Sequence, residues 1–290
     1  KQTIYISNHI KLNNTYFKLG ILTCVICLGC LFAFRKQQPS ALVTPSGTTI
    51  VARFSPPPNY TRIVSEKNSF ADFLQNTSLK PHGTLVHFYS GEEKSNKVAA
   101  AVLSYDVGNK DLQQCADAVM RLRAEYLYKT KQFDALHFNF TNGFNALYSK
   151  WRSGYRIVVK GNNVNWVKTA KESESYQSFR EYLNVVFTYA GTASLTKELK
   201  QITLAKMQIG DVFIKGGSPG HAVIVVDMAV NPKTNRKVFM IAQSYMPAQD
   251  IHILINTNKP AISPWYDLLE TASEVETAEW TFEGNQLKRF

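Results

Sequence analysis

Cys115, the one cysteine beyond the first 30 residues, is the side chain best suited to nucleophilic chemistry. In an exported chain, which the N-terminus described below indicates, such a lone thiol is either a packed core atom or a reactive group. Much later in the chain, Gly220-His221 opens the apolar run from Ala222 to Val226. Because a cysteine nucleophile needs a base such as imidazole, the sequence predicts a thiol–imidazole pair, with a buried structural cysteine as the alternative.

The residues around Cys115 predict a helix that begins close to it. Asp111 is a natural N-cap, and Gln114, three residues later, completes a capping-box pattern. Cys115 then lies in the first turn, where free backbone N–H groups and the helix dipole favour the thiolate. Gln113 or Gln114, together with the N–H of Cys115, are candidate oxyanion-hole donors. Cys115 also falls on the apolar stripe of this helix, which is the pattern of a core residue.

A third catalytic member is expected on the strand after His221. If the hairpin turn is centred near residues 232–233, His221 lies opposite Gln243, Ser244 or Tyr245. A side-chain amide at Gln243 would accept a hydrogen bond from the imidazole and fix its tautomer. Ser244 and His252 compete for the same role.

Other polar residues give weaker indications. Trp151 and Arg156 are candidate substrate-binding residues, with Arg156 or Arg152 holding a carboxylate, or they form a strand with solvated charges. The remaining histidines show no metal-ligand spacing, and no glycine-rich phosphate loop is present in the right context. We therefore expect neither a metal nor a cofactor.

The pattern of elements predicts an α+β fold in which the cysteine helix packs on an antiparallel sheet. Residues 208–214, 221–229 and 237–243 are expected as strands of an antiparallel meander. Further predicted strands and helices precede them. The strands are 84–89 and 98–105, and the helices are 69–74, 111 onward, 175–189 and 196–204.

Three short motifs in this second half resemble NlpC-type papain-like cysteine peptidases. These are Gly210-Asp211-Val212-Phe213, Gly220-His221-Ala222-Val223-Ile224-Val225 and Ile241-Ala242-Gln243-Ser244. The resemblance implies a papain-like core and hydrolysis of peptide or amide bonds in bacterial cell-wall peptides. The chain departs from that family at Gln114-Cys115-Ala116, where Asp or Asn usually precedes the cysteine. The distance from the cysteine to the first of the three motifs is also about twice the usual, so residues 137–200 are an insertion or a different layout.

From about residue 50 onward the chain resembles an uncharacterised bacterial family of exported proteins, a domain of unknown function. Three stretches carry this resemblance. They are Asp111-Leu112-Gln113-Gln114-Cys115-Ala116-Asp117, Arg121-Leu122-Arg123-Ala124-Glu125-Tyr126 and Pro247-Ala248-Gln249-Asp250. The resemblance implies no particular activity.

The N-terminal 35 residues are expected to be a signal peptide or a membrane anchor. Residues 19–34 are uncharged and follow Lys11 and Lys18, a pattern typical of both. Leu28-Gly29-Cys30 resembles the end of a bacterial lipobox, which makes Cys30 a candidate for lipidation. The proline-punctuated residues 36–62 are expected to be a linker, and residues 63–290 a single papain-like domain.

The charge argues against nucleic acid as a partner. The net charge is +11 over 290 residues, and nearly half of it lies in residues 1–38, which contain no acidic residue. The remainder carries a mild positive excess without a block of Lys and Arg, so no nucleic-acid-binding signature is present.

These observations together predict an exported cysteine hydrolase, tethered to the membrane at the cell envelope, in the periplasm or at the cell surface. Its substrate would be a peptide or a cell-wall-like polymer, with Cys115 as nucleophile, His221 as base and Gln243 as orienting residue. Acyl transfer uses the same residues as hydrolysis. The rival hypothesis is a non-catalytic envelope module that binds wall peptides or glycans with the same fold.

Overall fold

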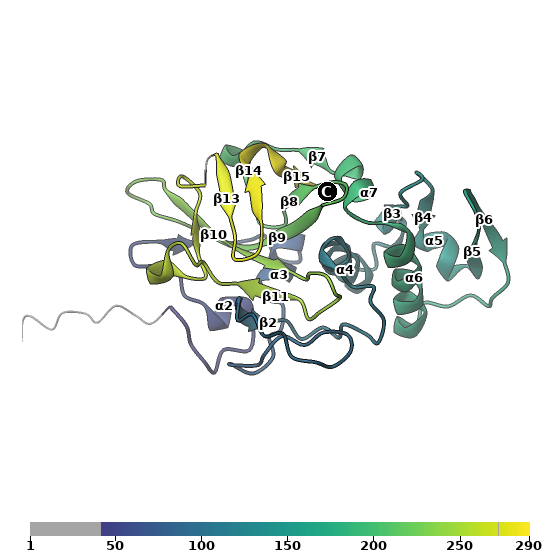
Figure 1. The fold of residues 1–290 in the computed structure, drawn as a ribbon, viewed down its shortest axis with the longest axis horizontal. Helices are drawn as coiled ribbons and strands as arrows, with labels where there is room; N and C mark the ends of the chain where they lie inside the picture. The colour runs from purple at the N-terminus through teal and green to yellow at the C-terminus, as the bar shows by residue number, and fades with distance from the viewer. Residues whose placement is uncertain (1–41, 272) are drawn as a thin grey trace, which may run out of the picture. The chain divides into compact units, whose positions relative to one another are not determined.

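A single large antiparallel sheet organises the part of the chain that the computed structural model describes, residues 42–271 and 273–290 (Figure 1). The sheet has nine strands; seven follow the order β2-β11-β10-β9-β8-β15-β7, while β1 also pairs with β9 and β12 with β10. Their bounds are β1 Thr61–Arg62, β2 Ala99–Val102, β7 Lys200–Gln201, β8 Val212–Lys215, β9 His221–Val230, β10 Lys237–Gln243, β11 His252–Leu254, β12 Tyr266–Asp267 and β15 Leu287–Arg289.

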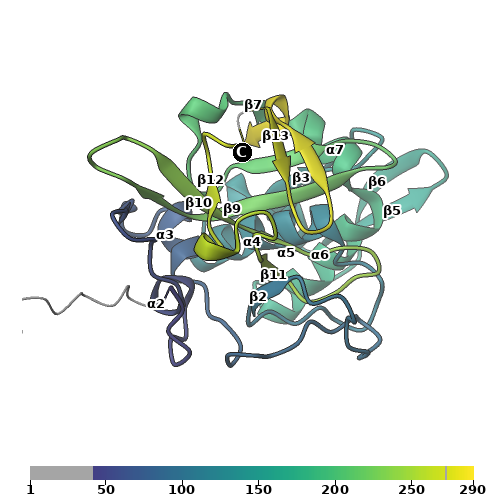
Figure 2. The ribbon, with the colours of Figure 1, turned by 60° about the vertical axis from the view of Figure 1, so that its left-hand side comes forward.

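The centre of the sheet is the meander β8–β9–β10, which confirms the strands predicted from residue 208 onward. Ile214 pairs with Ala222, and Val238 pairs with Ala229, both antiparallel. The β9–β10 register shifts by one residue between Met240 and Ile241, the signature of a β-bulge that increases local twist. The long β9–β10 hairpin extends well beyond its neighbours in Figure 2.

Both faces of the sheet are buried, and β9 alternates between them. Ala222, Ile224 and Val226 belong to the core cluster that includes helix α4. Val223 and Val225 belong to a second cluster with Phe213 and Phe282. A strand covered on both sides carries an unbroken apolar run, which explains the sequence of β9.

The helices and the remaining hairpins surround this sheet. The helices are α2 Ile50–Arg53, α3 Phe70–Gln75, α4 Cys115–Lys129, α5 Tyr148–Arg152, α6 Tyr176–Tyr189 and α7 Thr192–Glu198. Separate two-stranded hairpins are formed by β3 His137–Asn139 with β4 Asn145–Leu147, β5 Tyr155–Lys160 with β6 Asn163–Lys168, and β13 Glu274–Glu276 with β14 Thr281–Glu283. Short 3-10 turns lie at Phe133–Ala135, Leu204–Lys206, Pro260–Ile262 and Gly284–Gln286.

Two of the predicted helices are confirmed by their caps. The side chain of Ser69 accepts a hydrogen bond from Asp72 N–H at the start of α3, and Ser175 accepts one from Ser178 N–H at the start of α6. Each serine satisfies a backbone donor that the helix leaves free. The fold is therefore mixed α+β with mostly antiparallel pairing, as predicted.

Several boundaries differ from the expectation. Residues 42–62, expected as part of a linker over 36–62, belong to the folded unit, because α2 is buried in the core and β1 pairs with β9. Residues 84–89 form only isolated bridges, at His87 and Phe88, instead of a strand. The helix expected over 196–204 begins earlier, at Thr192. The neighbouring predicted strand, 98–105, contains β2, which pairs with β11 and not with residues 84–89.

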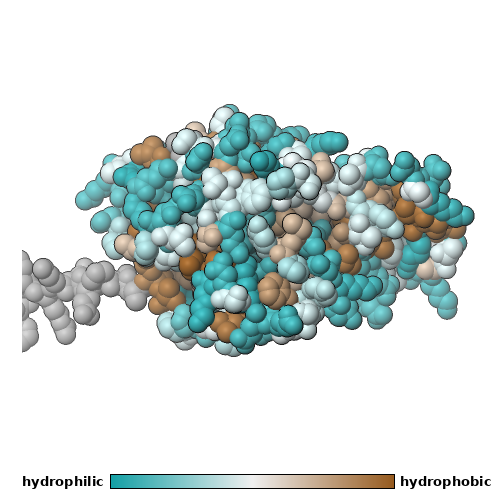
Figure 3. All heavy atoms as spheres, in the orientation of Figure 1, coloured by the Kyte–Doolittle hydropathy of each residue, from teal (hydrophilic) through white to brown (hydrophobic). Residues whose placement is uncertain are grey.

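The segment between residues 137 and 200 forms its own layer of helices and hairpins. It holds β3 to β6, α5, α6 and α7, and brown side chains gather on its β5–β6 end in Figure 3. No helix among residues 42–271 and 273–290 is long and apolar enough to cross a membrane. The predicted targeting segment, with Cys30, lies outside the described residues.

Candidate active site

Cys115 is the first residue of α4. The N-cap is Gln114 rather than the expected Asp111, and its backbone N–H donates to Asp117 Oδ2 at 3.0 Å. Asp111 instead accepts from Ala248 N–H at 2.6 Å and from Gln114 Nε2 at 3.0 Å. The nucleophile candidate therefore lies at the helix start, as predicted, while Asp111 ties this start to the loop after β10.

The thiol of Cys115 is a neutral group at rest. Its residue is 6 % exposed, and burial together with the nearby charge of Asp117 raises the thiol pKa to about 11. The backbone N–H groups of Ala222, Ala116 and Cys115 point at the sulfur and oppose this shift. The prediction that the helix start would favour the thiolate is therefore wrong for the resting site, because desolvation outweighs the N–H groups.

His221 is the first residue of β9, held in place by the glycine before it. A side chain at Gly220 would meet Gly217 O at 2.4 Å and Thr192 Oγ1 at 2.5 Å, so only glycine allows this close approach of the backbone. The imidazole is enclosed by aromatic rings. They are Tyr245, Trp280 and Phe282, with ring centroids 4.8, 5.3 and 5.7 Å from its own.

The imidazole is hydrogen-bonded to Gln243, one of the three residues that the hairpin geometry placed near it. Nε2 of His221 lies 2.8 Å from Oε1 of Gln243, and both residues are at most 1 % exposed. Burial lowers the pKa of His221 to about 4, and the bond to Gln243 opposes that shift. His221 is thus neutral near pH 7, which is the state a general base requires.

Two further charged residues support Gln243, and neither could be predicted from local sequence patterns. Gln243 Nε2 lies 2.7 Å from Glu279 Oε2 and 3.4 Å from His252 Nε2. Lys94 Nζ is 2.6 Å from Glu279 Oε1. Lys94 comes from a loop before β2 and Glu279 from the β13–β14 turn, so only the folded chain brings them to the site.

The thiol and the imidazole approach β9 from different sides. The side chain of His221 shares the face of Val223 and Val225, whereas Ala222 faces α4 and its N–H points at the sulfur of Cys115. Among the described residues, no hydrogen bond joins Cys115 to His221. The side-chain hydrogen bond of the imidazole goes to Gln243. Tyr245 adjoins His221, since its tilted ring lies beside the imidazole. Burial raises the pKa of Tyr245, with smaller contributions from Glu279 and from a thiolate at Cys115.

A cavity of about 400 Å³ opens beside the nucleophile candidate. The start of α4, the end of α6, the start of α7 and the loop before His221 line it. Its ionisable side chains are Cys115, Asp111 and Asp117. Burial raises the pKa of Asp117 well above its usual value, and Asp117 Oδ1 has no hydrogen-bond partner among the described residues.

The remaining predicted site residues divide between this cavity and other places. Gln114 lines the cavity, with its amide on Asp111, so it stays near the sulfur. Gln113 is turned away, because its Oε1 accepts from Arg121 inside the core. Trp151 and Arg156 do not line the cavity. The indole of Trp151 donates to Ser178 O, and the guanidinium of Arg156 stacks on Trp151 at 4.1 Å.

Asp211 of the Gly-Asp motif has a structural role. It is 1 % exposed and receives Arg289 in a two-pronged ion pair, with Nε–Oδ1 at 2.6 Å and Nη2–Oδ2 at 2.8 Å. This pair fastens β15 to the sheet beside β8. The motif therefore indicates the strand arrangement and contributes no group to the candidate site.

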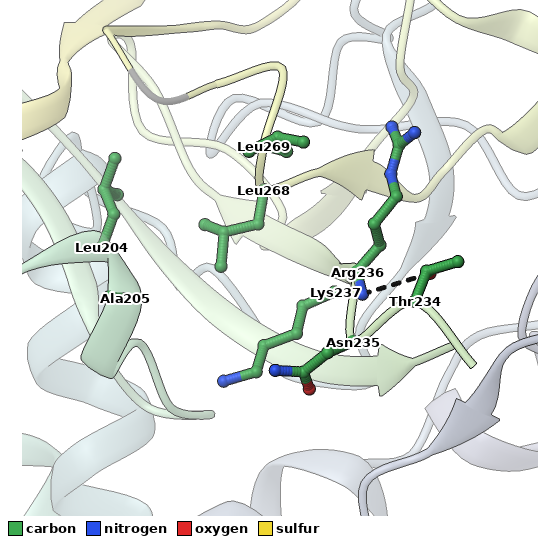
Figure 4. Close-up of a pocket in the computed structure, with 8 residues that line it drawn as sticks. All are labelled: Leu204, Ala205, Thr234, Asn235, Arg236, Lys237, Leu268 and Leu269. Carbon is green, nitrogen blue, oxygen red and sulfur yellow. Dashed lines mark hydrogen bonds between the residues drawn. The ribbon is translucent and has the colours of Figure 1, made fainter. Parts of the chain in front are cut away.

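A second cavity lies far from this chemistry. It measures about 460 Å³ and is lined by the β9–β10 turn and by Leu204, Leu268 and Leu269 (Figure 4). Its lining contains no Cys, His, Asp or Glu side chain. Among the described residues, no group of three or more His, Cys, Asp or Glu side chains is placed to hold a metal ion.

Comparison with family models shows the family of this chain. The model of a family described as a domain of unknown function (4846) matches residues 50–289. This range begins at α2 and ends in β15, so it includes the whole sheet and every residue of the candidate site. No curated protein and no solved structure matched the chain.

Proposed function

Since the chain belongs to the family described as domain of unknown function 4846, we propose its activity from the site itself: it is a cysteine hydrolase of peptide or amide bonds. Cys115 is the nucleophile, His221 the general base and Gln243 the residue that orients the base. The core would then be papain-like, similar to NlpC-type peptidases.

The bond between His221 Nε2 and Gln243 Oε1, at 2.8 Å, carries the proposal. A buried imidazole with an amide oxygen on one nitrogen has its other nitrogen free to accept a proton. The same strand start supplies the Ala222 N–H that points at the Cys115 sulfur. The lack of a thiol–imidazole bond at rest is compatible with this role, because catalytic hydrogen bonds often form only with substrate bound.

In the proposed reaction, the Cys115 thiol gives its proton to His221 Nδ1 as the sulfur attacks the carbonyl carbon. The tetrahedral intermediate collapses to a thioester when the imidazolium returns that proton to the leaving amine. Water then attacks the thioester, again with His221 as base, and a carboxylic acid leaves as the imidazolium returns the proton to the sulfur of Cys115. The atoms and protons balance with water as the only co-substrate.

Backbone donors at the helix start would stabilise the oxyanion. The backbone of Cys115, Ala116 and Ala222 lowers the thiol pKa by hydrogen bonding, so these N–H groups would be available to the carbonyl oxygen of a bound acyl group. Preorganised donors of this kind contribute through the charge that develops on that oxygen. The Gln114 amide lines the same cavity and adds a side-chain donor.

The proposed substrates are wall peptides at the cell envelope. This part of the proposal rests on the uncharged N-terminal run and on Cys30, which would export the chain and tether it to a membrane. No nucleic-acid partner is proposed, and no cofactor is required by the reaction.

A binding module without catalysis is the second candidate, and one observation favours it. The pKa of Cys115 is raised to about 11 and that of His221 lowered to about 4, so the pair at rest is neutral. In this candidate the cavity beside α4 holds a wall peptide or glycan that is released unchanged.

Alkylation of Cys115 by iodoacetamide separates the two. The full chain is labelled between pH 5 and 10, and mass spectrometry follows the peptide that contains Cys115, alongside His221→Gln and the exposed control His82→Gln. For a hydrolase we expect labelling at pH 7 to fall about tenfold or more in His221→Gln and to stay unchanged in His82→Gln. Slow labelling that ignores His221 supports the binding module.

A turnover assay completes the test. Wall-derived peptides are incubated with the full chain and with Cys115→Ala, and new amino groups are counted. The proposal expects release by the natural chain alone, with closely similar melting temperatures for both proteins. A large loss of stability in Cys115→Ala without loss of turnover makes Cys115 a core residue.

A further inference from the structure

The β13–β14 turn brings a carboxylate to the back of the candidate site. In this turn, Thr277 Oγ1 donates to Trp280 O at 2.7 Å and accepts from Trp280 N–H at 3.0 Å. These bonds fix the conformation of the turn from Thr277 to Trp280. As a result, Glu279 points at Gln243 and Trp280 lies against the His221 ring. The turn therefore determines which hydrogen bonds the amide of Gln243 can form.

Glu279 is largely buried and its charge is matched. Its side chain is 12 % exposed, and that of Lys94 is 7 % exposed. Lys94 Nζ also donates to Gln249 Oε1 at 2.9 Å. A carboxylate paired with the Lys94 ammonium accepts hydrogen bonds and donates none.

This carboxylate decides which way the Gln243 amide faces. Because Glu279 Oε2 accepts, the atom 2.7 Å away must be the NH₂ group of Gln243. The amide oxygen then faces His221, so Nε2 of His221 must carry the proton. Nδ1 is left bare, and it alone can take the proton of a thiol.

His252 favours the same orientation of the Gln243 amide. Its Nδ1 lies 2.9 Å from Asp250 O, a carbonyl that only accepts, so Nδ1 is protonated and Nε2 is an acceptor. That acceptor faces the NH₂ group of Gln243 at 3.4 Å. A flipped amide would place its oxygen against both His252 Nε2 and Glu279.

We propose that Glu279, held by Lys94, is a positioning residue that sets the tautomer of His221 through the amide of Gln243. This rests on the proposed function only for its consequence in catalysis, because the tautomer itself is a property of the folded chain. Without the carboxylate, the flipped amide would stabilise a proton on Nδ1 and remove the base from the side that serves the thiol.

Nitrogen NMR of the full chain with ¹⁵N-labelled histidine tests the proposal. The shifts of the two ring nitrogens distinguish the tautomers, and His221→Gln identifies the His221 signals. In the natural chain we expect the proton on Nε2. In Glu279→Gln, whose amide can donate or accept, we expect a mixture that includes the Nδ1–H tautomer, and labelling of Cys115 at pH 7 reduced about tenfold.

Glu276→Gln is the matched control. Glu276 belongs to the same hairpin and is exposed, and its carboxylate accepts a hydrogen bond only from Asn258 Nδ2 among the described residues. The tautomer and the labelling rate should therefore not change. Where Glu279→Gln does not fold, the charge-neutral pair Glu279→Gln with Lys94→Met replaces it.

The NMR result either overturns or supports the positioning role of Glu279. A natural chain with the proton on Nδ1, or a folded Glu279→Gln chain with an unchanged tautomer, overturns the proposal. A shifted tautomer in Glu279→Gln supports it even if no hydrolysis is ever detected, in which case the proposed function fails and the positioning role stands.

Discussion

Nε2 of His221 lies 2.8 Å from Oε1 of Gln243, although 22 residues separate them and neither is the register partner of the other. The β9–β10 pairing continued past Ile224 and Ala242 would place His221 opposite Tyr245. The contact instead runs diagonally across the same face of the two strands. Diagonal neighbours on one face lie within reach of long side chains, and glutamine has the length that this distance requires.

Replacing Gln243 by methionine, which keeps the volume, should destabilise the fold and slow the labelling of Cys115. The change leaves the buried imidazole N–H of His221 without an acceptor, and an unsatisfied buried polar group costs about 1–3 kcal/mol. Urea unfolding measures the stability, and the rate of iodoacetamide labelling at pH 7 measures how well His221 activates the Cys115 thiol.

Gln75→Met is the control for that prediction. Gln75 is also buried, and it donates to Asp227 Oδ1 at 2.7 Å far from Cys115. It should lose similar stability and keep the labelling rate. Equal labelling in both variants would remove Gln243 from the candidate site.

The hairpin could be predicted from the sequence because its signals are local. The apolar run after Gly220 and the turn near residues 232–233 place His221 within one or two residues of its partner. Glu279 and Lys94 follow no such rule, since they belong to a C-terminal turn and to a loop before β2. Their meeting at Gln243 depends on the packing of the whole sheet, which periodicity does not encode.

The charge state of Cys115 was mispredicted for a related reason. The helix start was visible in the sequence, but the burial of the thiol and the position of Asp117 were not. Both raise the thiol pKa, and burial contributes more than Asp117. Trp151 and Arg156 likewise form a plausible pocket wall in sequence, while in the fold they stack on each other and bond the backbone of α5 and α6.

Asp117→Asn should lower the pKa of the Cys115 thiol and speed its alkylation. The negative charge of Asp117 opposes the thiolate, and asparagine keeps an oxygen for the Gln114 N–H. Labelling rates measured from pH 7 to pH 11 give the pKa directly. Asp134→Asn, an exposed site in a 3-10 turn, should leave the profile unchanged; a rise in pKa in Asp117→Asn would contradict the assignment.

Stability should fall as the pH drops from about 6.5 to about 4, through His221 and His252. Burial lowers the pKa of both to about 4. The unfolded chain therefore binds more protons in this window than the folded chain, and folding loses free energy there. Each pKa unit corresponds to about 1.4 kcal/mol, so each of the two residues contributes about 3 kcal/mol.

The contribution of the two histidines is isolated by comparing how the free energy of unfolding changes with pH in several variants. Asp117, Asp227 and Glu198 have raised pKa values and act with the opposite sign, so the net profile is a sum. Urea unfolding at pH 4.5 and pH 7 should show a smaller difference for His221→Gln and His252→Gln than for the natural chain. The exposed His82→Gln should match the natural chain, and equal slopes in all four would contradict the buried neutral state.

Asp211→Asn should destabilise the fold without changing the reactivity of Cys115. Asparagine keeps the size of the side chain but removes the charge that pairs with Arg289, which is partly exposed to solvent. Because that exposure screens the pair, we expect a loss of about 1–3 kcal/mol rather than the larger loss typical of a fully buried pair. Thermal unfolding measures the stability and iodoacetamide labelling the reactivity. If the labelling rate fell while the melting temperature stayed the same, Asp211 would act in the candidate site and would not serve to attach β15 to the sheet.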